Sequence, residues 1–356
     1  MISRPRRSER RRQIAMPNQK DIARILGVSQ GAVSLALRGD ASVSPALRKK
    51  AKAVARKLGY RPNPYVSSLM SQIRVARKPS EQGSIALVVD RYQEQAWLRH
   101  ESYSVYHRGL VRRAGELGYR IEPFFLQESG MSAARVDRIL HARGIRGLIL
   151  APPYFGNRRL AITWQRYACV GTGYAWEEQQ FDRVAHDHDQ NAFAAVQHLK
   201  RLGYRRIGLV LPTFFATGRG TRWLDGLLVA QNGLPKADRV PVLVGSPEEG
   251  SRPAFRRWLG RWKPDVVLTL YGHEQAWLDE LGLSVPRDIG LACLIRRPGT
   301  ALAGIDDRYG EIGAATVELV AAKIGFNHYG VPAIPRLILI EGRWVAGRSL
   351  RRQRQD

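Results

Sequence analysis

The residues at 29–35 have the types and the spacing that a protein needs to read the edges of DNA bases. They lie in the segment QKDIARILGVSQGAVSLALRG at 19–39, where a glycine separates two short stretches with helical apolar spacing. Val33 and Leu37, at i and i+4, would face a small core and leave the polar start of the second helix exposed. Gln30 there can pair with an adenine edge through two hydrogen bonds. The pattern predicts a helix-turn-helix whose second helix enters the major groove.

Other chemistries find little support in the sequence. His186-Asp187-His188-Asp189 contains metal-ligand residue types, but a loop that leads into a helix N-terminus explains its acidic residues better. The glycine-containing stretch at 216–222 lacks the Lys-Ser/Thr ending of a phosphate-binding loop. The sequence has no GxSxG motif and no Cys/His pair at catalytic spacing. We therefore expect no enzyme, no cofactor and no metal site.

Positive charge is concentrated at the N-terminal end of the chain. The 356 residues include 57 Lys or Arg and 31 Asp or Glu, a formal net charge of +26. Residues 1–80 contain 19 of these basic residues and 3 of the acidic ones, a net charge of +16. A small basic module joined to a larger domain gives this asymmetry, and DNA is a polyanion that suits it. The first 17 residues are interpreted as a basic flexible arm, with a wrongly assigned start as the alternative.

The elements that must position these residues follow from the apolar pattern. Helices are expected at 19–26, 30–37 and 45–58, and Ser29 and Ser44 are suitable N-caps. From residue 84 onward, helical stretches alternate with strands predicted at 84–90, 119–125, 147–151, 167–171, 206–212, 240–245, 265–270 and 289–295. This alternation predicts parallel α/β sheets in two subdomains. Ligands of such folds bind at the carboxyl ends of the strands, so a site between the subdomains is expected.

Cysteine usage and hydropathy bear on the compartment. Cys169 and Cys293 lie in apolar runs and are expected to be reduced core residues. No apolar run approaches the length that spans a membrane, and no apolar region follows the basic N-terminus as in a signal peptide. We therefore expect a cytoplasmic protein with no membrane partner.

The sequence resembles the LacI/GalR family of transcription regulators. DIARILGVS, AVS and VSPALRKKAKAVARKLGYRPNPYVSSL carry the resemblance almost continuously from Gln19 to about Met70. Looser counterparts are HLKRLGYRRIGLVLP, LGLSVPRDIGLA and GVPAIPRLILIEGRWVAGRSL. The resemblance implies an all-α helix-turn-helix headpiece followed by an α/β two-subdomain, periplasmic-binding-protein-like sensor. It also implies a homodimer, a near-palindromic double-stranded DNA operator and a small-molecule effector, with repression as the commoner outcome in the family.

The resemblance carries over unevenly to the DNA-binding residues. Gln30 and Gly31 fall on base-reading positions, whereas Leu35 stands where many members have an arginine. Leu69 falls on the hinge-helix residue that wedges between base pairs in the minor groove and kinks the duplex. For Gln30, an exposed helix face without a role is the alternative. The full expected set is Ser29, Gln30, Gly31, Ser34, Leu35, Arg61, Asn63 and Leu69.

The sensor departs from the sugar-binding pattern of the family. Ile295 stands where the family often has an aspartate, and Trp223 where it has an arginine. The effector therefore stays open, with a sugar or sugar derivative as one alternative. Strand ends and the resemblance predict an effector-binding set of Asp90, Tyr106, Tyr154, Arg219, Arg222, Trp223, Tyr271 and His273. A core or dimer-interface position is the alternative for each.

The expected domain boundaries follow from these assignments. They are a basic arm at 1–17, the headpiece at 18–62, a hinge helix and linker at 63–83, the sensor at 84–350 and a basic tail at 351–356. Within the sensor, the first subdomain is expected to take about 84–185 and 305–325, and the second about 186–304 and 326–346. The sequence does not support two rival functions. A periplasmic-type binding protein would need a signal peptide, and an α/β enzyme with a basic appendage would need a catalytic set.

Overall fold

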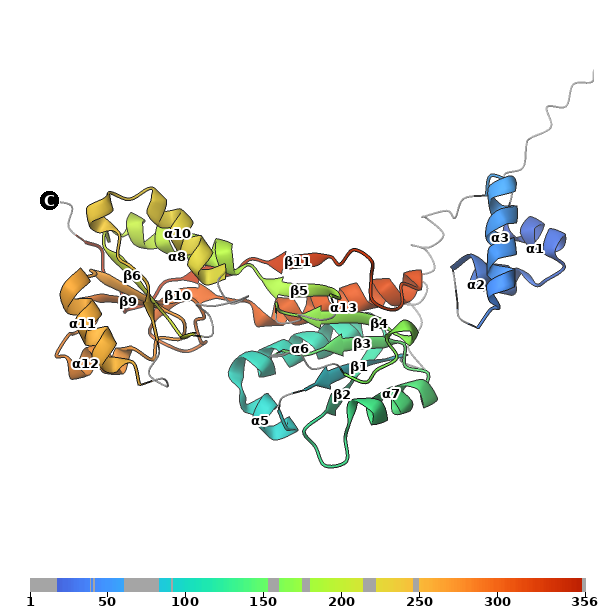
Figure 1. Ribbon diagram of the computed structural model, residues 1–356, viewed down its shortest axis with the longest axis horizontal. Helices are drawn as coiled ribbons and strands as arrows, with labels where there is room; N and C mark the ends of the chain where they lie inside the picture. Colours follow the sequence, from blue (N-terminus) through green and yellow to red (C-terminus); the bar gives the residue numbers. More distant parts are fainter. Residues whose placement is uncertain are drawn as a thin grey trace, which may run out of the picture. The chain divides into compact units, whose positions relative to one another are not determined.

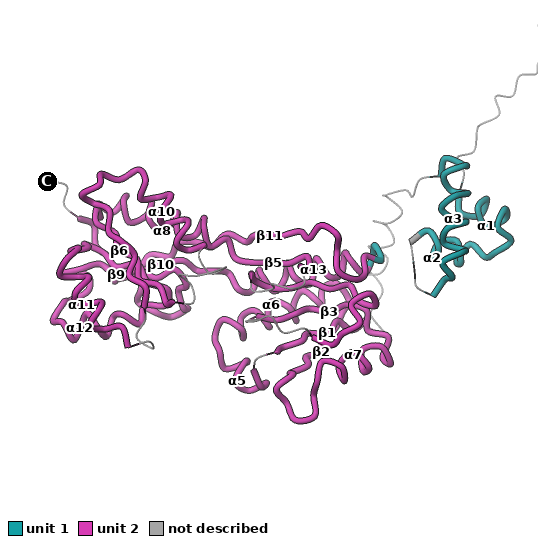
Figure 2. The backbone as a smooth tube through the Cα atoms, viewed as in Figure 1, with its two compact units in different colours: residues 1–79, 325–327 teal, residues 80–324, 328–356 magenta. Residues whose placement is uncertain are grey.

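The structure, a computed structural model, describes residues 18–38, 40, 42–60, 83–90, 92–152, 160–174, 180–213, 222–245 and 250–353. The chain divides into two compact units (Figure 2), with the helical N-terminal region in one and the α/β region in the other. No helix among the described residues is long and apolar enough to cross a membrane.

The first unit contains the three expected helices (Figure 1), α1 (Gln19–Leu26), α2 (Gln30–Arg38) and α3 (Pro45–Lys57). Its core is small. Ile22, Val33 and Ala55 are buried together, and Ala36 and Ala51 belong to a second cluster. Alanines at these positions let the helices approach closely, which is how so few residues exclude water. The predicted helix-turn-helix is confirmed.

The first sheet of the α/β unit has six parallel strands in the order β11-β5-β4-β3-β1-β2. Alternate residues of β1 (Gly83–Val89) face opposite layers of helices, as the period of a strand requires. Ile85 and Leu87 pack with residues of α5, α6 and α13, whereas Ala86 and Val88 pack with residues of α7. The bounds of the elements are α5 (Glu94–Arg99), α6 (Glu101–Glu116), β2 (Tyr119–Phe125), α7 (Ala133–Ala142), β3 (Gly147–Leu150), β4 (Ala168–Thr172), β5 (Asp182–His186), α13 (Tyr309–Phe326) and β11 (Leu337–Ile340).

The second sheet has the order β12-β10-β9-β8-β6-β7, and only β12 runs antiparallel to its neighbour. Leu209 faces the layer of α8 and α10, and Val210 faces the layer of α11 and α12. Helices thus cover both faces, as the alternation predicted. The bounds are α8 (His188–Arg201), β6 (Ile207–Leu211), α10 (Arg222–Asn232), β7 (Leu243–Val244), α11 (Arg252–Trp262), β8 (Val266–Thr269), α12 (Gln275–Glu280), β9 (Gly290–Cys293), β10 (Ala303–Asp306) and β12 (Arg343–Val345).

The chain passes three times between the two sheets. It passes from β5 to α8, from β10 back to α13, and from β11 to β12. Strand β11 differs from the expected division, because the segment at 326–346 was assigned to the second subdomain and β11 pairs with β5 of the first sheet. Strand β10 straddles the expected boundary at about 304–305 and pairs with β9 of the second sheet. Apolar runs predict strands but not which neighbour a strand pairs with, and this is why the expected place of β11 was wrong.

Candidate functional site

The turn between α1 and α2 sets the direction of the second helix. Asn18 begins α1 with reciprocal bonds, because its Oδ1 accepts the N–H of Asp21 at 3.3 Å and its own N–H donates to Asp21 Oδ2 at 3.0 Å. Gly27 ends α1 at a φ of 64°, a left-handed conformation that side-chain-bearing residues rarely adopt. Glycine at this position lets α2 start only three residues later.

The N-terminal end of α2 presents the polar residues that were predicted to read DNA. Gln30 and Gly31 are exposed, and Ser34 is half-buried. Ser29 is the N-cap, since its Oγ accepts the N–H of Ala32 at 3.1 Å. The hydroxyl proton of Ser29 can still be donated to a phosphate oxygen. The described part of the predicted base-reading set therefore lies along one end of one helix.

Leu35 is partly committed to the headpiece core. It is half-buried and packs against the cluster of Ala36, Val43 and Ala51. Only part of its side chain is therefore accessible for an apolar contact with DNA, such as one with a thymine methyl group.

Helix α3 carries the positive charge of the headpiece. Ser44 caps it by accepting the N–H of Leu47 at 3.3 Å, and Pro45 occupies the first helical position. Ala51 and Ala55 face the core. The exposed side chains include five cations that suit long-range attraction to phosphates, Lys49, Lys50, Lys52, Arg56 and Lys57.

Some predicted site residues lie outside the described residues, and for these the sequence interpretation stands alone. They are Arg61, Asn63, Leu69, Tyr154 and Arg219, together with the basic arm at 1–17.

In the sensor, a group of polar residues joins all three passages of the chain between the sheets. We call His186, Asn191, Asp307 and Gly342 the crossover cluster. Asn191 Nδ2 donates to Asp307 Oδ1 at 3.0 Å, and Asn191 Oδ1 accepts the N–H of Gly342 at 2.7 Å. His186 Nδ1 lies 3.1 Å from the carbonyl oxygen of Asp307. A carbonyl only accepts, so Nδ1 of His186 carries the proton.

Burial disfavours charge in the crossover cluster. Asp307 is 2% exposed, and burial, followed by the negative charge of Asp306, raises its pKa well above the usual range. Burial lowers the pKa of His186 to about 4, so its imidazole is neutral at neutral pH. His186 Nδ1 lies 3.8 Å from Asp307 Oδ2, and burial of Asp307 favours the protonated form of its carboxyl group.

Aromatic rings continue from this cluster into the second subdomain. The ring of His188 stacks on His186 at 5.4 Å and lies 3.9 Å from the ring of Trp223. Burial lowers the pKa of His188 well below its usual value. Arg222 lies 4.5 Å from the ring centre of Tyr174, whose hydroxyl donates to the carbonyl of His186. We call His186, His188, Trp223, Tyr174 and Asp307 the wall; its side chains are mostly neutral, and the guanidinium of Arg222 lies at its edge.

Three deeply placed polar atoms of this wall have no hydrogen-bond partner among the described residues. They are Trp223 Nε1, His188 Nδ1 and Asp307 Oδ2. Leaving a buried polar atom unpaired costs about 1–3 kcal/mol. Hydroxyl and amide groups match such atoms, because an indole N–H donates and an imidazole nitrogen or a carboxyl oxygen donates or accepts according to where its proton lies.

A second aromatic group includes residues from both subdomains. His100 stacks on Tyr103 at 4.1 Å in the first, and Tyr271 stacks on His273 at 5.6 Å in the second. Arg297 Nη2 lies 3.3 Å from His273 Nε2. Burial, and next the charge of Arg297, lower the pKa of His100.

The structure distributes the predicted effector residues between core and site. Tyr106 is fully buried, and its hydroxyl is 2.7 Å from Thr172 Oγ1, which places it in the core of the first subdomain. Asp90 is 5% exposed at the end of β1, and its carbonyl accepts from Gln127. Trp223 combines a core position with the unpaired nitrogen noted above.

Sequence reasoning missed three members of the crossover cluster, Asn191, Asp307 and Gly342. It interpreted the segment with His186 and His188 as a loop leading into a helix N-terminus, with a metal site as the disfavoured alternative, and among the described residues no three His, Cys, Asp or Glu side chains gather as a metal-binding set. Asp307 directly follows β10, so the rule that sites form at the carboxyl ends of strands was a signal that pointed to it.

Two protein-family models match the chain. "Bacterial regulatory proteins, lacI family" matches residues 19–63, and "Periplasmic binding protein-like domain" matches residues 196–350. The HTH-type transcriptional regulator CelR of Thermobifida fusca is 26% identical over 298 residues, which are 80% of this chain and 82% of that protein. The ribose operon repressor of Escherichia coli is 26% identical over 316 residues, 83% of this chain and 91% of that protein.

Solved structures agree on the fold. A complex of the transcriptional regulator CelR with cellobiose has a TM-score of 0.57 at 21% identity, over 94% of this chain and 99% of that one. A lac repressor dimer bound to operator and an anti-inducer has a TM-score of 0.56 at 19% identity, over 94% and 98%. Each likeness covers 94% of this chain, and the two family models fall in the same order, a helix-turn-helix region before a periplasmic-binding-protein-like region, which confirms the predicted fold class.

Proposed function

The chain belongs to the LacI/GalR family of transcription regulators, and on this premise we propose that it is a homodimeric repressor of a near-palindromic DNA operator. A small molecule held between the two sensor subdomains changes its affinity for that operator. The observation that carries the proposal is the exposed N-terminal end of α2 in a helix-turn-helix, with Gln30 and Gly31 accessible. The chain then acts in the cytoplasm, where its DNA is, and no catalytic step is assigned to it.

The two-fold symmetry of a dimer explains why the operator should be near-palindromic. Each headpiece would insert one α2 into the major groove of one half-site, and the half-sites would lie about one or more helical turns apart. The solved lac repressor, a relative in fold, is a dimer on its operator. For this chain Leu69 is the proposed wedge between the half-sites, on sequence grounds.

Control by the effector would be a shift between two populations of the sensor. A ligand changes operator affinity only when it binds two arrangements of the subdomains unequally. Asn191 is hydrogen-bonded to both of the other passages between the sheets. A change in the relative position of the subdomains would act on these passages, so the crossover cluster lies where the two arrangements would differ. Whether the ligand releases or strengthens operator binding follows from which arrangement it prefers.

The site supports an uncharged, polar effector, with a sugar or sugar derivative as the leading class. Burial disfavours the charged forms of Asp307 and His186, and the three unpaired polar atoms suit hydroxyl groups. Named relatives bind cellobiose or govern a ribose operon. Trp223 and Ile295 replace an arginine and an aspartate of the usual sugar-binding set, so the contacts must differ from those of such relatives.

Selection of bound sequences from a random duplex pool by the purified full-length chain tests the proposal. A two-fold symmetric motif with a fixed centre is the expected result, and its loss in a Gln30→Ala variant would assign the base contact. Binding that depends only on salt, with no enriched motif in the presence or absence of cellobiose and ribose, would overturn the claim that the chain reads sequence.

A further inference from the structure

Three turns meet at the amino end of the second sheet, the end away from the passages between the subdomains. They are the turn after α8, the turn after α11 and the C-terminal tail. Gln353 donates its N–H to the carbonyl of Leu202 at 2.8 Å, and Arg351 donates its own to Tyr204 Oη at 3.1 Å. The tail is therefore fixed against the turn after α8.

The turn after α11 is fixed to the same place. Asp265 accepts the backbone N–H groups of Arg205 and Arg206 at 2.7 and 3.1 Å, and the side chain of Arg206 donates to the carbonyls of Trp262 and Lys263. Segments about 60 residues apart (Arg205 and Asp265) and about 150 residues apart (Leu202 and Gln353) are thus held together by hydrogen bonds to backbone groups. The arrangement is rigid enough to present side chains in a constant pattern.

These turns expose six cations, which we call the basic tip: Arg201, Arg205, Arg261, Lys263, Arg351 and Arg352. Within the three turns, the only carboxylate among the described residues is Asp265, and its oxygens are occupied by backbone donors. None of the six makes an ion pair with a described residue, whereas nearby Arg287 pairs with Asp288 at 3.1 Å. Repulsion among six like charges without counter-charges is unfavourable, and binding of an anionic partner to the tip would relieve it.

We propose that the basic tip is a second DNA-binding surface, which holds the phosphate backbone of a duplex without reading its sequence. Five of the six cations are arginines, whose planar guanidinium groups bind phosphate oxygens through paired hydrogen bonds. The tip contains no exposed large apolar residue among those described, which disfavours insertion into a lipid surface. A sensor with this surface holds non-operator DNA while its headpieces occupy the operator, and so joins two stretches of duplex.

The salt dependence of binding to a non-operator duplex is the first measurement. Each phosphate contact adds about 0.9 to the slope of log K against log salt concentration. Replacement of Arg201, Arg205, Arg351 and Arg352 by glutamine in the full chain should therefore lower the magnitude of that slope by up to about 3.6. The matched control replaces four exposed arginines of the first subdomain, Arg99, Arg108, Arg135 and Arg138, which changes the net charge equally.

Capture of a second duplex separates the tip from the headpiece. Full-length protein saturated with immobilised operator duplex is offered a labelled duplex without the operator. Capture by the unmodified protein and by the control variant, with at least tenfold less capture by the tip variant, is the expected result. Equal capture by all three proteins would overturn the proposal. Binding of the three proteins to vesicles with anionic lipid is measured in parallel. If the tip variant lost vesicle binding but still captured the duplex, the tip would bind lipid and the proposal would be wrong. Operator affinity in the same variants reports on the headpiece separately.

Discussion

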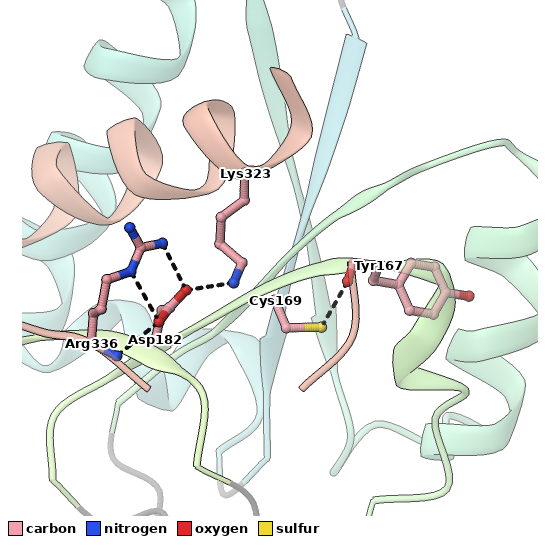
Figure 3. A network of polar contacts seen from close by, with 5 residues as sticks. All are labelled: Tyr167, Cys169, Asp182, Lys323 and Arg336. Carbon is pink, nitrogen blue, oxygen red and sulfur yellow. Dashed lines mark hydrogen bonds and ion pairs between the residues drawn. The ribbon is translucent and has the colours of Figure 1, made fainter. Parts of the chain in front are cut away.

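Lys323 Nζ donates to Asp182 Oδ2 at 2.6 Å, and the two side chains are 3% and 2% exposed. The pair joins α13 to the first residue of β5 (Figure 3). Arg336, before β11, adds a second cation, with Nη2 at 3.1 Å from Asp182 Oδ2. One carboxylate thus connects a helix and two strand starts that are more than 150 residues apart in the sequence.

Removal of the buried ammonium group of Lys323 should lower the free energy of unfolding. Lys323→Met keeps the aliphatic length but deprives Asp182 of its shortest bond, and breaking one partner of a buried pair destabilises by about 3–5 kcal/mol. The residual bonds from Arg336 favour the lower end of that range. Urea unfolding of the α/β unit measures it. Arg336→Gln is the control and should lose less unfolding free energy, since the Arg336 side chain is 60% exposed. Equal losses of stability in both variants would contradict the view that Lys323 is the main partner of Asp182.

The same carboxylate gives stability a pH dependence. Burial would raise the pKa of Asp182, but the bonds from Arg336 and Lys323 outweigh it and hold the pKa below its usual value. The contribution is therefore fully present above the pKa of an unfolded aspartate and is lost as the pH falls through the folded value. Unfolding free energies from pH 7 to pH 3 should decline more steeply in the natural chain than in an Asp182→Asn, Lys323→Met double variant. Parallel curves would exclude Asp182 as the source.

Asp307 should show the opposite sign. Its raised pKa means that the unfolded chain releases this proton at a lower pH than the folded chain, so the group destabilises increasingly as the pH rises above about 4. Asp307→Asn preserves the oxygen that accepts from Asn191 and removes the titration. We expect the variant to be at least as stable at pH 5 and to gain further at pH 8, by thermal unfolding. A loss of stability at pH 8 would mean that Asp307 is ionised and paired in solution.

Gln30→Ala tests the base contact without a structural change. A bidentate contact with a base contributes about 1–3 kcal/mol of discrimination, a factor of roughly 5 to 150 in relative affinity. Gln30 is exposed, so headpiece stability should change by less than about 0.5 kcal/mol. Titration of operator and base-substituted duplexes measures the ratio. Lys49→Gln on α3 is the contrast, because it should weaken binding to all duplexes alike.

Gly226 permits the contact between α8 and α10. A Cβ at this position would lie 2.1 Å from the carbonyl oxygen of Asp189 and 2.9 Å from the Cβ of Ala192. Gly226→Ala should therefore force the helices apart at a cost of about 1–3 kcal/mol, and would shift Arg222 and Trp223 with α10. Thermal unfolding and near-ultraviolet circular dichroism of the tryptophans measure both effects. Gly233→Ala, which meets no atom within 4 Å, is the neutral control.

The sequence by itself determined the headpiece, because local signals there agree. The caps at Asn18 and Ser44, the left-handed glycine at 27 and the apolar spacing each act within a few residues, and all three helices formed where expected. It also determined the alternation of strands and helices, because a strand buried on both faces must be apolar throughout. The two cysteines are buried in the sheets for the same reason.

Only the tertiary structure decided which strands are neighbours and which polar residues meet. The pairing of β11 with β5 depends on contacts over about 150 residues, for which no local pattern exists. The crossover cluster brings His186, Asn191, Asp307 and Gly342 together from three passages of the chain, and the basic tip combines three separate turns in the same way. A polar residue looks the same in a sequence whether it faces water or a buried partner. Its role is set by burial and by the partners that long-range folding supplies, which is why these sites became visible only in three dimensions.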